Sequence, residues 1–502
     1  MYNKFLSGTF FNIIFKIIST ILLFFITPLF ISKMGEELYG IWILNFTIIG
    51  FFALVINGLP GGIIKFVSEN NKDPNYLSKI ISISLFTYLI IGLILGSVIF
   101  IFSEQITIVF NISEVNRPIS IKLLKIASFF LAILWPLSIS DSVLQGLLKF
   151  KELNIVRSLQ VVANSSVILL GLYFELDLGY ILAFSYSTTC ICSIVMFFYV
   201  KKFINPLKIS FNTYDKTLFK EIMFFSFALV AIELSALLAY QSDELIIGYF
   251  LNVKDIPYYF VTTALFLNLR IIYGILTGLI LPVVFEAKKK SDYKLIDNLV
   301  FKGIRYINII FITFVILVSI VSEPFITLWM GEKFSKYSFW ASLLVLQYLY
   351  NASYVSFLSR ILLGFSEVKF VFYINFIFNI TKILLSIYLV SEYNIIGVFS
   401  ASIINSIISF IFLFPIISKK LNYSWFKLIK NNFTIHLFQA LLIIIGFTIV
   451  NYIAISWVNL VFFCFTFLLI AYFIQYHLFF LDKEKIYVIN LINNLKKKFF
   501  SK

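Results

Sequence analysis

The sequence predicts an all-α membrane protein with about fourteen transmembrane helices and both termini on the cytoplasmic side. Of its 502 residues, 61% are hydrophobic and only 13% are charged, and the mean hydropathy is +0.98. Soluble domains are about half apolar and a quarter charged, so this composition excludes a soluble fold. Apolar blocks of roughly 20 residues, the length that crosses a 30 Å hydrocarbon core, recur along the whole chain.

About fourteen such blocks are found with the window that identifies transmembrane helices. In chain order they cover residues 10–31, 39–64, 77–102, 119–147, 154–174, 179–200, 218–249, 257–285, 302–328, 338–363, 370–391, 395–418, 433–454 and 456–480. The first block lacks a small-residue cleavage site, so we expect a retained helix and not a signal peptide.

The loops between the blocks alternate in charge along the chain. Basic loops, such as the one with Lys288, Lys289 and Lys290, alternate with acidic loops, such as the one with Glu175 and Asp177. Cytoplasmic loops are enriched in Lys and Arg, so the basic loops are expected inside. A miscounted helix would break the alternation, and the alternation is unbroken.

A weak internal repeat relates the two halves at an offset of about 219 residues, where Ser103-Glu104 aligns with Ser322-Glu323. The repeat unit contains six helices, an even number, so the two copies are expected to be parallel repeats about an axis normal to the membrane. This predicts an N-lobe over 1–205, a C-lobe over 206–420 and two further helices over 421–481. Residues 482–502 read as a basic amphipathic cytoplasmic tail.

Other functional classes find little support in the sequence. No loop is long enough to form a catalytic domain, which disfavours an enzyme. The three Cys and two His show no metal-ligand spacing, so no metal site is expected. Topology explains the net charge of +15, and nucleic acid is not an expected partner.

Several short motifs resemble those of a known family. They are Gly-Glu-x-x-Tyr-Gly at 35–40, Gly-Leu-Leu-Lys-Phe at 146–150, Asp-x-x-Ile-Ile-Gly-Tyr-Phe-Leu at 243–251 and Leu-Trp-Met-Gly at 328–331. With the fourteen spans, they are similar to the polysaccharide transporter family, the Wzx-type oligosaccharide flippases of the multidrug/oligosaccharidyl-lipid/polysaccharide (MOP) exporter superfamily.

The resemblance implies a V-shaped, MATE-like pair of lobes that works by alternating access in the bacterial inner membrane. It implies an undecaprenyl-pyrophosphate-linked oligosaccharide as cargo, for O-antigen or capsule synthesis, with membrane lipids, a polymerase and chain-length machinery as partners. We expect a monomer without a cofactor, and the sequence leaves open whether transport is coupled to H⁺, coupled to Na⁺ or uncoupled. The alternatives are a multidrug or cation antiporter of the same fold, a peptidoglycan-precursor flippase, and a membrane glycosyltransferase or polymerase.

Cations inside the predicted helices are the candidate substrate-binding residues, because an uncompensated pyrophosphate is costly to move through a low-dielectric region. They are Lys16, Arg157, Arg270 and Lys382. Related flippases also use cations in the first and eighth helices, which favours Lys16 and Arg270. The alternatives are that Lys16 snorkels to the interface and that Arg270 pairs with Glu233.

At about 100° per residue, helical phase places each candidate cation on a polar face of its predicted helix. On the first helix this face is Asn12, Lys16, Ser19 and Thr27, and on the seventh it is Ser226, Glu233, Tyr240 and Glu244. The other faces are Arg157, Gln160 and Asn164; Thr263, Arg270, Gly274 and Thr277; and Asn375, Asn379, Lys382 and Ser386. Such polar stripes predict a hydrated central chamber.

Carboxyl groups and helix breakers complete the expected transport machinery. Glu233, Asp141 and Asp243 are candidates for ion coupling, because a carboxyl in a partly dry cavity can take up a proton on one side and release it on the other. The expected gate residues are Gly58, Pro60 and Gly61 in the second helix and Gly274 and Pro282 in the eighth. The alternative is that these kinks are static.

Overall fold

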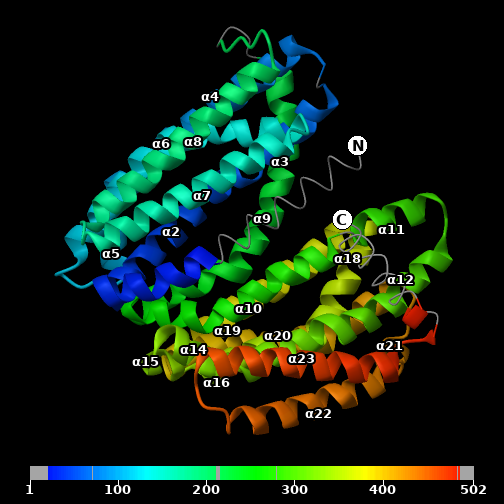
Figure 1. Cartoon of the computed structure of the whole chain (residues 1–502). Helices are drawn as coiled ribbons and strands as arrows, with labels where there is room; N and C mark the ends of the chain where they lie inside the picture. The colour runs from blue at the N-terminus through cyan, green and yellow to red at the C-terminus, as the bar shows by residue number, and fades with distance from the viewer. Residues whose placement is uncertain (1–20, 71, 211–214, 279, 483, 487–502) are drawn as a thin grey trace, which may run out of the picture. The chain divides into compact units, whose positions relative to one another are not determined.

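The computed structural model describes residues 21–70, 72–210, 215–278, 280–482 and 484–486, and within them the chain is helical without a β-strand (Figure 1). Eleven of the described helices are long and apolar enough to cross a membrane. The prediction of an all-α, multi-pass membrane protein is therefore confirmed. The count of fourteen spans and the orientation of the termini stay predictions.

The chain forms two compact units. Unit 1 comprises Met1–Tyr259 and Ile383–Val398, and unit 2 comprises Phe260–Lys382 and Phe399–Lys502. These units are defined by contacts, whereas the predicted lobes are defined by the repeat, so the lobe boundaries remain a prediction. Helix α9 (Lys216–Phe250) belongs to unit 1 because it packs against α2 (Glu36–Asn57) and α3 (Leu59–Glu69).

Unit 1 begins, in its described part, with the apolar helix Ile21–Met34. The elements that follow α2 and α3 are α4 (Pro74–Ile101), α5 (Ser103–Val109), α6 (Arg117–Gly146), α7 (Phe150–Tyr173), α8 (Leu178–Phe203), α9 and the 3₁₀ turn η2 (Val253–Asp255). Loop aspartates begin several of these helices. Asp73, for example, accepts hydrogen bonds from the backbone N–H groups of Asn75 and Tyr76, which helix geometry leaves unpaired.

Close backbone packing holds α4 and α6 together. Gly92 and Gly96, four residues apart on α4, lie against α6, and a Cβ atom at Gly96 would come within 2.8 Å of the Ser128 carbonyl oxygen. Small residues at this spacing let membrane helices approach closely, where van der Waals packing replaces the hydrophobic effect.

Unit 2 contains most of α10 (Ile256–Thr277) and the helices that follow it. They are α11 (Ile280–Lys289), α12 (Tyr293–Tyr306), η3 (Ile307–Ile312), α13 (Thr313–Ile320), α14 (Ser322–Met330), α15 (Glu332–Ser335), α16 (Ser338–Leu346), α17 (Tyr348–Tyr350), η4 (Asn351–Ser356), α18 (Phe357–Gly364), α19 (Val368–Tyr393), α20 (Ile395–Lys420), α21 (Trp425–Lys430), α22 (Phe433–Val450) and α23 (Trp457–Phe479). A short stretch of α19 and α20, residues 383–398, belongs to unit 1.

Two π-helical turns, η3 and η4, interrupt the membrane helices of unit 2. Such turns widen the helix and leave backbone carbonyl groups to find other partners. The Tyr472 hydroxyl donates to the Ile310 carbonyl at 2.8 Å, and the Tyr273 hydroxyl donates to the Ala352 carbonyl at 2.8 Å. Helices α23 and α10 therefore hold the two turns in place.

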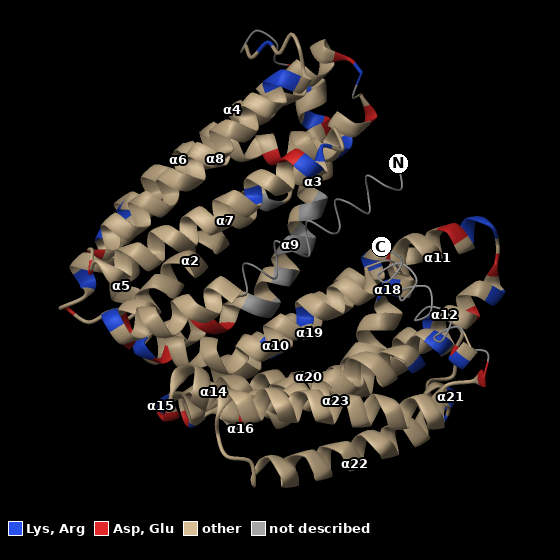
Figure 2. Ribbon diagram, viewed as in Figure 1, with Lys and Arg blue, Asp and Glu red and all other residues tan. Residues whose placement is uncertain are grey.

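Charged residues gather at helix ends and in loops, and the middle stretches of most helices carry none (Figure 2). This is the distribution expected of helices that cross a hydrocarbon layer, where a charge is costly. The few charges that lie inside the spans therefore stand out as candidates for function.

Candidate functional site

The second predicted helix breaks within the segment expected to bend. Helix α2 ends at Asn57 and α3 begins at Leu59, with Pro60 in the first turn of α3 and Gly61 just after it. Gly58 packs directly against α9, because a Cβ atom there would lie 2.4 Å from the Ser226 carbonyl oxygen. The break between α2 and α3 therefore lies where the chain packs closely against α9, and its role as a gate stays a prediction.

The eighth predicted helix breaks at the corresponding position. Helix α10 ends at Thr277 and α11 begins at Ile280, with Pro282 inside α11. Gly274 lies within α10, and a Cβ atom there would meet nothing within 4 Å. This face of α10 therefore borders open space, in contrast to the tightly packed Gly58.

Two predicted site residues of unit 1 pair with each other. Arg157 on α7 donates to one Asp141 oxygen of α6 through Nη2 at 2.8 Å and Nε at 3.1 Å. About 30% of each side chain is exposed, 33% for Arg157 and 29% for Asp141. The expectation assigned them separate roles, and the structure joins them in one ion pair that links consecutive helices.

The predicted stripe on α7 continues from this pair. Asn164 donates to the Thr189 hydroxyl of α8 at 3.0 Å and also bonds to Thr188. The exposed apolar side chains of α7 lie on the opposite side of the helix, at about 100° per residue; they are Ile155, Leu159, Val162 and Leu170. The stripe therefore faces away from lipid and joins α6, α7 and α8.

Residues 253–259, which follow the motif at 243–251, link it to the motif at 35–40 within unit 1. Asp243 is fully buried and accepts a hydrogen bond of 2.5 Å from the Tyr259 hydroxyl, and Tyr258 donates to Glu36 at 2.9 Å. Gly40 touches the backbone of Val253, whose carbonyl oxygen would lie 2.1 Å from a Cβ atom. Residues 253–259 thus pack on the first motif and, through Tyr259, bond to the buried Asp243 of the second.

Glycines at two motif positions have a backbone reason to be glycine. Gly35 precedes α2 with φ of 85°, and Gly331 precedes α15 with φ of 88°. Residues other than glycine rarely adopt a backbone conformation with such a positive φ.

Unit 2 carries cations in the interior of its spans. Arg270 on α10 is exposed, and Lys382 on α19 is only 8% exposed. On α10 the exposed apolar residues Ile272, Ile275 and Leu276 lie roughly opposite Arg270. Arg270 is therefore exposed on the side of its helix that faces away from lipid.

The same geometry holds on α19. Its exposed apolar residues lie roughly opposite the stripe that contains Lys382; they are Tyr373, Ile377, Leu384 and Tyr388. Ser386, on the predicted stripe, is fully buried. The stripe on α19 is thus turned away from lipid, and the predicted hydrated chamber stays a prediction.

One cation within a span was missed by the sequence analysis. Arg360 on α18 is half-buried, and its guanidinium lies 5.7 Å from the centre of the Tyr273 ring. Its position inside the apolar block 338–363 was a usable signal. It lies near the end of that block, where a long cation commonly reaches the interface, and therefore did not stand out.

A buried polar network at η3 was also missed. Gln439 on α22 donates to the Asn308 carbonyl at 2.7 Å, and the Ser353 hydroxyl donates to the Asn308 side chain at 2.6 Å. His436 lies 2.9 Å from Gln439 and 2.6 Å from the Tyr354 hydroxyl. The network ties α22 to both π-helical turns, and polar residues within apolar blocks were its sequence signal.

Two predicted site residues fall outside what the structure describes. Lys16 lies outside the described residues. Glu233 lies within α9, but its side chain is outside the described part, so its pairing with Arg270 stays a prediction. Most of the predicted amphipathic tail, from residue 487 onward, is also outside the described residues.

Ion pairs near the ends of the spans join helices to the neighbouring loops. Lys122 donates to Asp177 at 2.7 Å, and this hydrogen bond lowers the pKa of the Asp177 carboxyl. Arg305 donates to Glu484 at 2.6 Å. Burial acts to raise the pKa of Glu484, but hydrogen bonds from Tyr306, the Leu481 backbone and Arg305 outweigh it, so the pKa is lowered.

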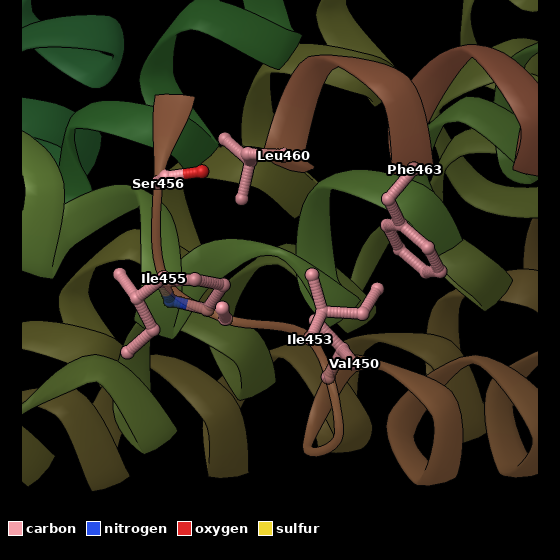
Figure 3. Close-up of a pocket in the computed structure, with 8 residues that line it drawn as sticks. Val450, Ile453, Ile455, Ser456, Leu460 and Phe463 are labelled. Carbon is pink, nitrogen blue, oxygen red and sulfur yellow. The ribbon is translucent and has the colours of Figure 1, made fainter. Parts of the chain in front are cut away.

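Two hollows lined by described residues have no charged residue in their lining. One lies at the turn from α22 to α23, where Figure 3 shows Val450, Ile453, Leu460 and Phe463 around it. Another lies between α3, α4 and α9 and includes Ser84 and Tyr88. These apolar hollows do not provide a binding site for an anion.

The fold is that of MOP superfamily transporters. The lipid II flippase MurJ in an inward closed conformation superposes with a TM-score of 0.71 and 20% identity, over 96% of this chain and 99% of that chain. An inward-facing multidrug resistance MATE family transporter of the MOP superfamily superposes with a TM-score of 0.64 and 11% identity, over 81% of this chain and 96% of that chain.

The profile of the polysaccharide biosynthesis protein family matches residues 34–339. The chain belongs to this family, as its motifs predicted. It is 22% identical to the putative O-antigen transporter of Shigella flexneri over 326 residues, 64% of this chain and 75% of that protein. It is 25% identical to the uncharacterized membrane protein EpsK of Bacillus subtilis (strain 168) over 343 residues, 64% of this chain and 65% of that protein.

These relationships support a membrane flippase. The similar proteins with a named role are transporters or flippases. The prediction that the chain is not an enzyme is confirmed by this kinship.

Proposed function

We propose that the protein flips a lipid-linked oligosaccharide repeat unit from the inner to the outer leaflet of the bacterial inner membrane, for surface polysaccharide synthesis. Family membership and the relative named as a putative O-antigen transporter support this cargo class. The fold shared with a lipid II flippase is compatible with a lipid-linked sugar.

The charge of the spans in unit 2 is the observation that carries the proposal. Arg270 and Lys382 lie within its described spans, well away from the helix ends, whereas its described carboxylates lie near helix ends or in loops. An interior with cations and without carboxylates suits an anionic group such as a diphosphate, which arginine contacts in a bidentate manner. An antiporter for cationic drugs would need carboxylates in the same place.

Unit 1 supplies the carboxyl groups that coupling to an ion would need. Asp243 is buried and bonded to Tyr259, whereas Asp141 is engaged with Arg157. We assign coupling to Asp243 or Glu233, with H⁺ or Na⁺ as the ion. Lys16, Arg270 and Lys382 are assigned to the cargo, and Arg157 contributes to it only if its pair with Asp141 opens.

Gly58 and Gly278 mark the two helix breaks at which bending would alternate access between the two sides of the membrane. Pro60 and Pro282 each follow a break closely, where a missing backbone N–H costs little.

Polymerase and chain-length proteins of the same assembly pathway remain proposed partners.

A peptidoglycan precursor is the second candidate cargo, because the fold matches a lipid II flippase over nearly the whole chain. Both cargoes are diphosphate-linked sugars on a lipid, so the charge argument applies to each. Neighbouring genes separate them: glycosyltransferase and polymerase genes support the surface polysaccharide, and their absence contradicts it.

Substitution of Arg270 tests the proposal in cells. A strain that depends on this gene for surface polysaccharide should lose the polymer with Arg270→Gln while the protein level stays unchanged. Arg270→Lys keeps the charge and should retain part of the polymer. Normal polymer with Arg270→Gln would contradict the assignment of Arg270, and loss of the protein itself would favour a structural role.

A further inference from the structure

The π-helical turn η3 interrupts one membrane span of unit 2. Helix α12 ends at Tyr306, η3 covers Ile307–Ile312, and α13 begins at Thr313. The backbone of a π turn bonds to the fifth residue along the chain and not to the fourth, so the turn holds one more residue than a turn of α-helix. Helix α13 is therefore rotated by about 100°, the angle of one residue, relative to an uninterrupted α-helix. The register of α13 thus depends on η3.

The C-terminal hairpin, formed by α22 and α23 and coloured orange to red in Figure 1, supplies hydrogen-bond donors to this turn from both of its helices. On α22, the Gln439 amide donates to the Asn308 carbonyl at 2.7 Å. On α23, the Tyr472 hydroxyl donates to the Ile310 carbonyl at 2.8 Å. Both acceptors are backbone carbonyls inside η3, and the conformation of η3 decides where they point. These two bonds are therefore made to the π-helical form of the backbone.

The same hairpin also contacts the residues on either side of the turn. After η3, the Gln475 amide donates to the Thr313 hydroxyl at 2.7 Å, and Gln475 is fully buried. Before η3, Arg305 donates to the Phe479 carbonyl at 2.6 Å. Tyr472, Gln475 and Phe479 are three and four residues apart on α23, so they lie on one face of that helix. One face of α23 thus contacts the span before, within and after its π turn.

The register of α13 determines its contact with α16. The Ser342 hydroxyl donates to the Ser319 carbonyl at 2.9 Å, and the Ser319 hydroxyl donates to the Ser342 carbonyl at 3.2 Å. Helix α12 is anchored before η3, where the Tyr423 hydroxyl donates to Asp297. If η3 became α-helical while α12 stayed in place, α13 would turn by about 100°. Val318 would then take the place of Ser319 beside Ser342.

We propose that the C-terminal hairpin holds the α12–α13 span in its π-helical register, and that loss of its donors lets the span become a continuous α-helix with α13 rotated by one residue. π-helical turns are rare in proteins, so an apolar span without such donors is expected to be α-helical throughout. The inference goes beyond the proposed function, because it assigns a conformational role to the two helices that follow the predicted six-helix repeats.

Rates of disulfide formation between engineered cysteines measure the register in the purified full-length protein. The three native cysteines are first replaced with alanine. Ser342→Cys is then combined with Ser319→Cys, which reports the π-helical register, or with Val318→Cys, which reports the α-helical one. Copper phenanthroline is the oxidant, and mass spectrometry detects the disulfide. The initial rate of each pair follows the population of the register that brings its two cysteines together.

With an unchanged hairpin, the 319–342 pair should react faster than the 318–342 pair. Tyr472→Phe removes only the hydroxyl that donates to η3, and it should raise the initial rate of the 318–342 pair about fivefold, the population shift expected for one lost hydrogen bond. Addition of Gln439→Leu should raise that rate about 25-fold in total. Thr466→Val is the matched control, because Thr466 lies on α23 and donates to carbonyls of its own helix. It should change neither rate.

Three results would overturn the inference. An unchanged 318–342 rate in Tyr472→Phe would show that the π turn does not depend on the hairpin. An equal rise in Thr466→Val would show a general loosening of helix packing. A faster 318–342 than 319–342 reaction with an unchanged hairpin would show that the span is not in the π-helical register. If the variant with both substitutions does not fold, Tyr472→Phe alone decides, because it keeps the ring and its packing.

Discussion

The ion pair between Asp141 and Arg157 permits a quantitative test of what holds unit 1 together. Both N–H groups of Arg157 that contact Asp141 reach the same oxygen, at 2.8 and 3.1 Å, with about a third of each side chain exposed. Exposed pairs contribute about 0.2 to 1 kcal/mol, and breaking a buried pair costs about 3 to 5 kcal/mol. For this intermediate burial we expect a coupling free energy of about 1 to 2 kcal/mol.

A double-mutant cycle of Asp141→Asn and Arg157→Gln measures that coupling. Unfolding in detergent can be followed with a thiol-reactive fluorophore, because Cys190 and Cys192 are half-buried on the neighbouring helix α8. Each single variant should lower the free energy of unfolding, and the double variant should lose less than their sum. A coupling below about 0.3 kcal/mol would refute the assignment of this pair to the stability of unit 1.

Three further predictions concern the hinge, the loops and the π-helical turn. Gly58→Val should lower the free energy of unfolding by about 1 to 3 kcal/mol, because its Cβ would lie within 2.4 Å of the α9 backbone. Gly274→Ala is the control, because there is open space around Gly274. Equal losses of unfolding free energy in the two variants would contradict the packing argument. Asp177→Asn should flatten the pH dependence of the free energy of unfolding at acid pH. Because the pKa of Asp177 is lowered, its pair with Lys122 stabilises the fold at pH values above the ordinary pKa of 3.8, and this contribution is lost as the pH falls toward the folded-state pKa. The contribution is less than about 1 kcal/mol, because the pair is exposed. Identical pH profiles would refute this. Gln439→Leu should cost about 1 to 2 kcal/mol in the same unfolding assay, because it removes the donor to a carbonyl of η3, and an unchanged unfolding free energy would show that the carbonyl has other partners.

Hydropathy and loop charge were sufficient to predict the class of fold and most helix positions. The break at Gly58 could also be predicted, because glycine and proline act locally on the backbone. The π-helical turns could not, because they depend on donors such as Gln439 and Tyr472, which lie far away in the sequence. The division into units depends equally on long-range packing, such as that of α9 on α2.

The candidate site was predictable residue by residue but not in its pairings. Helical phase placed Arg157, Arg270 and Lys382 on polar faces, and the structure turns those faces away from the exposed apolar residues. Helical phase could not show that Asp141 forms an ion pair with Arg157. Arg360 was missed because it lies near the end of its apolar block, and its contact with the Tyr273 ring of another helix could not be predicted.

Transport in proteoliposomes tests the central claim, that the cations in unit 2 carry an anionic, lipid-linked cargo. The measurement follows a fluorescent oligosaccharide on polyprenyl diphosphate from one leaflet to the other, with a cationic dye as the comparison. We predict that the purified protein moves the lipid-linked sugar and not the dye, and that Arg270→Gln slows it by roughly tenfold or more, the effect of one lost charge-assisted contact. Movement of the dye without the lipid-linked sugar, or an unchanged rate with Arg270→Gln, would contradict the account.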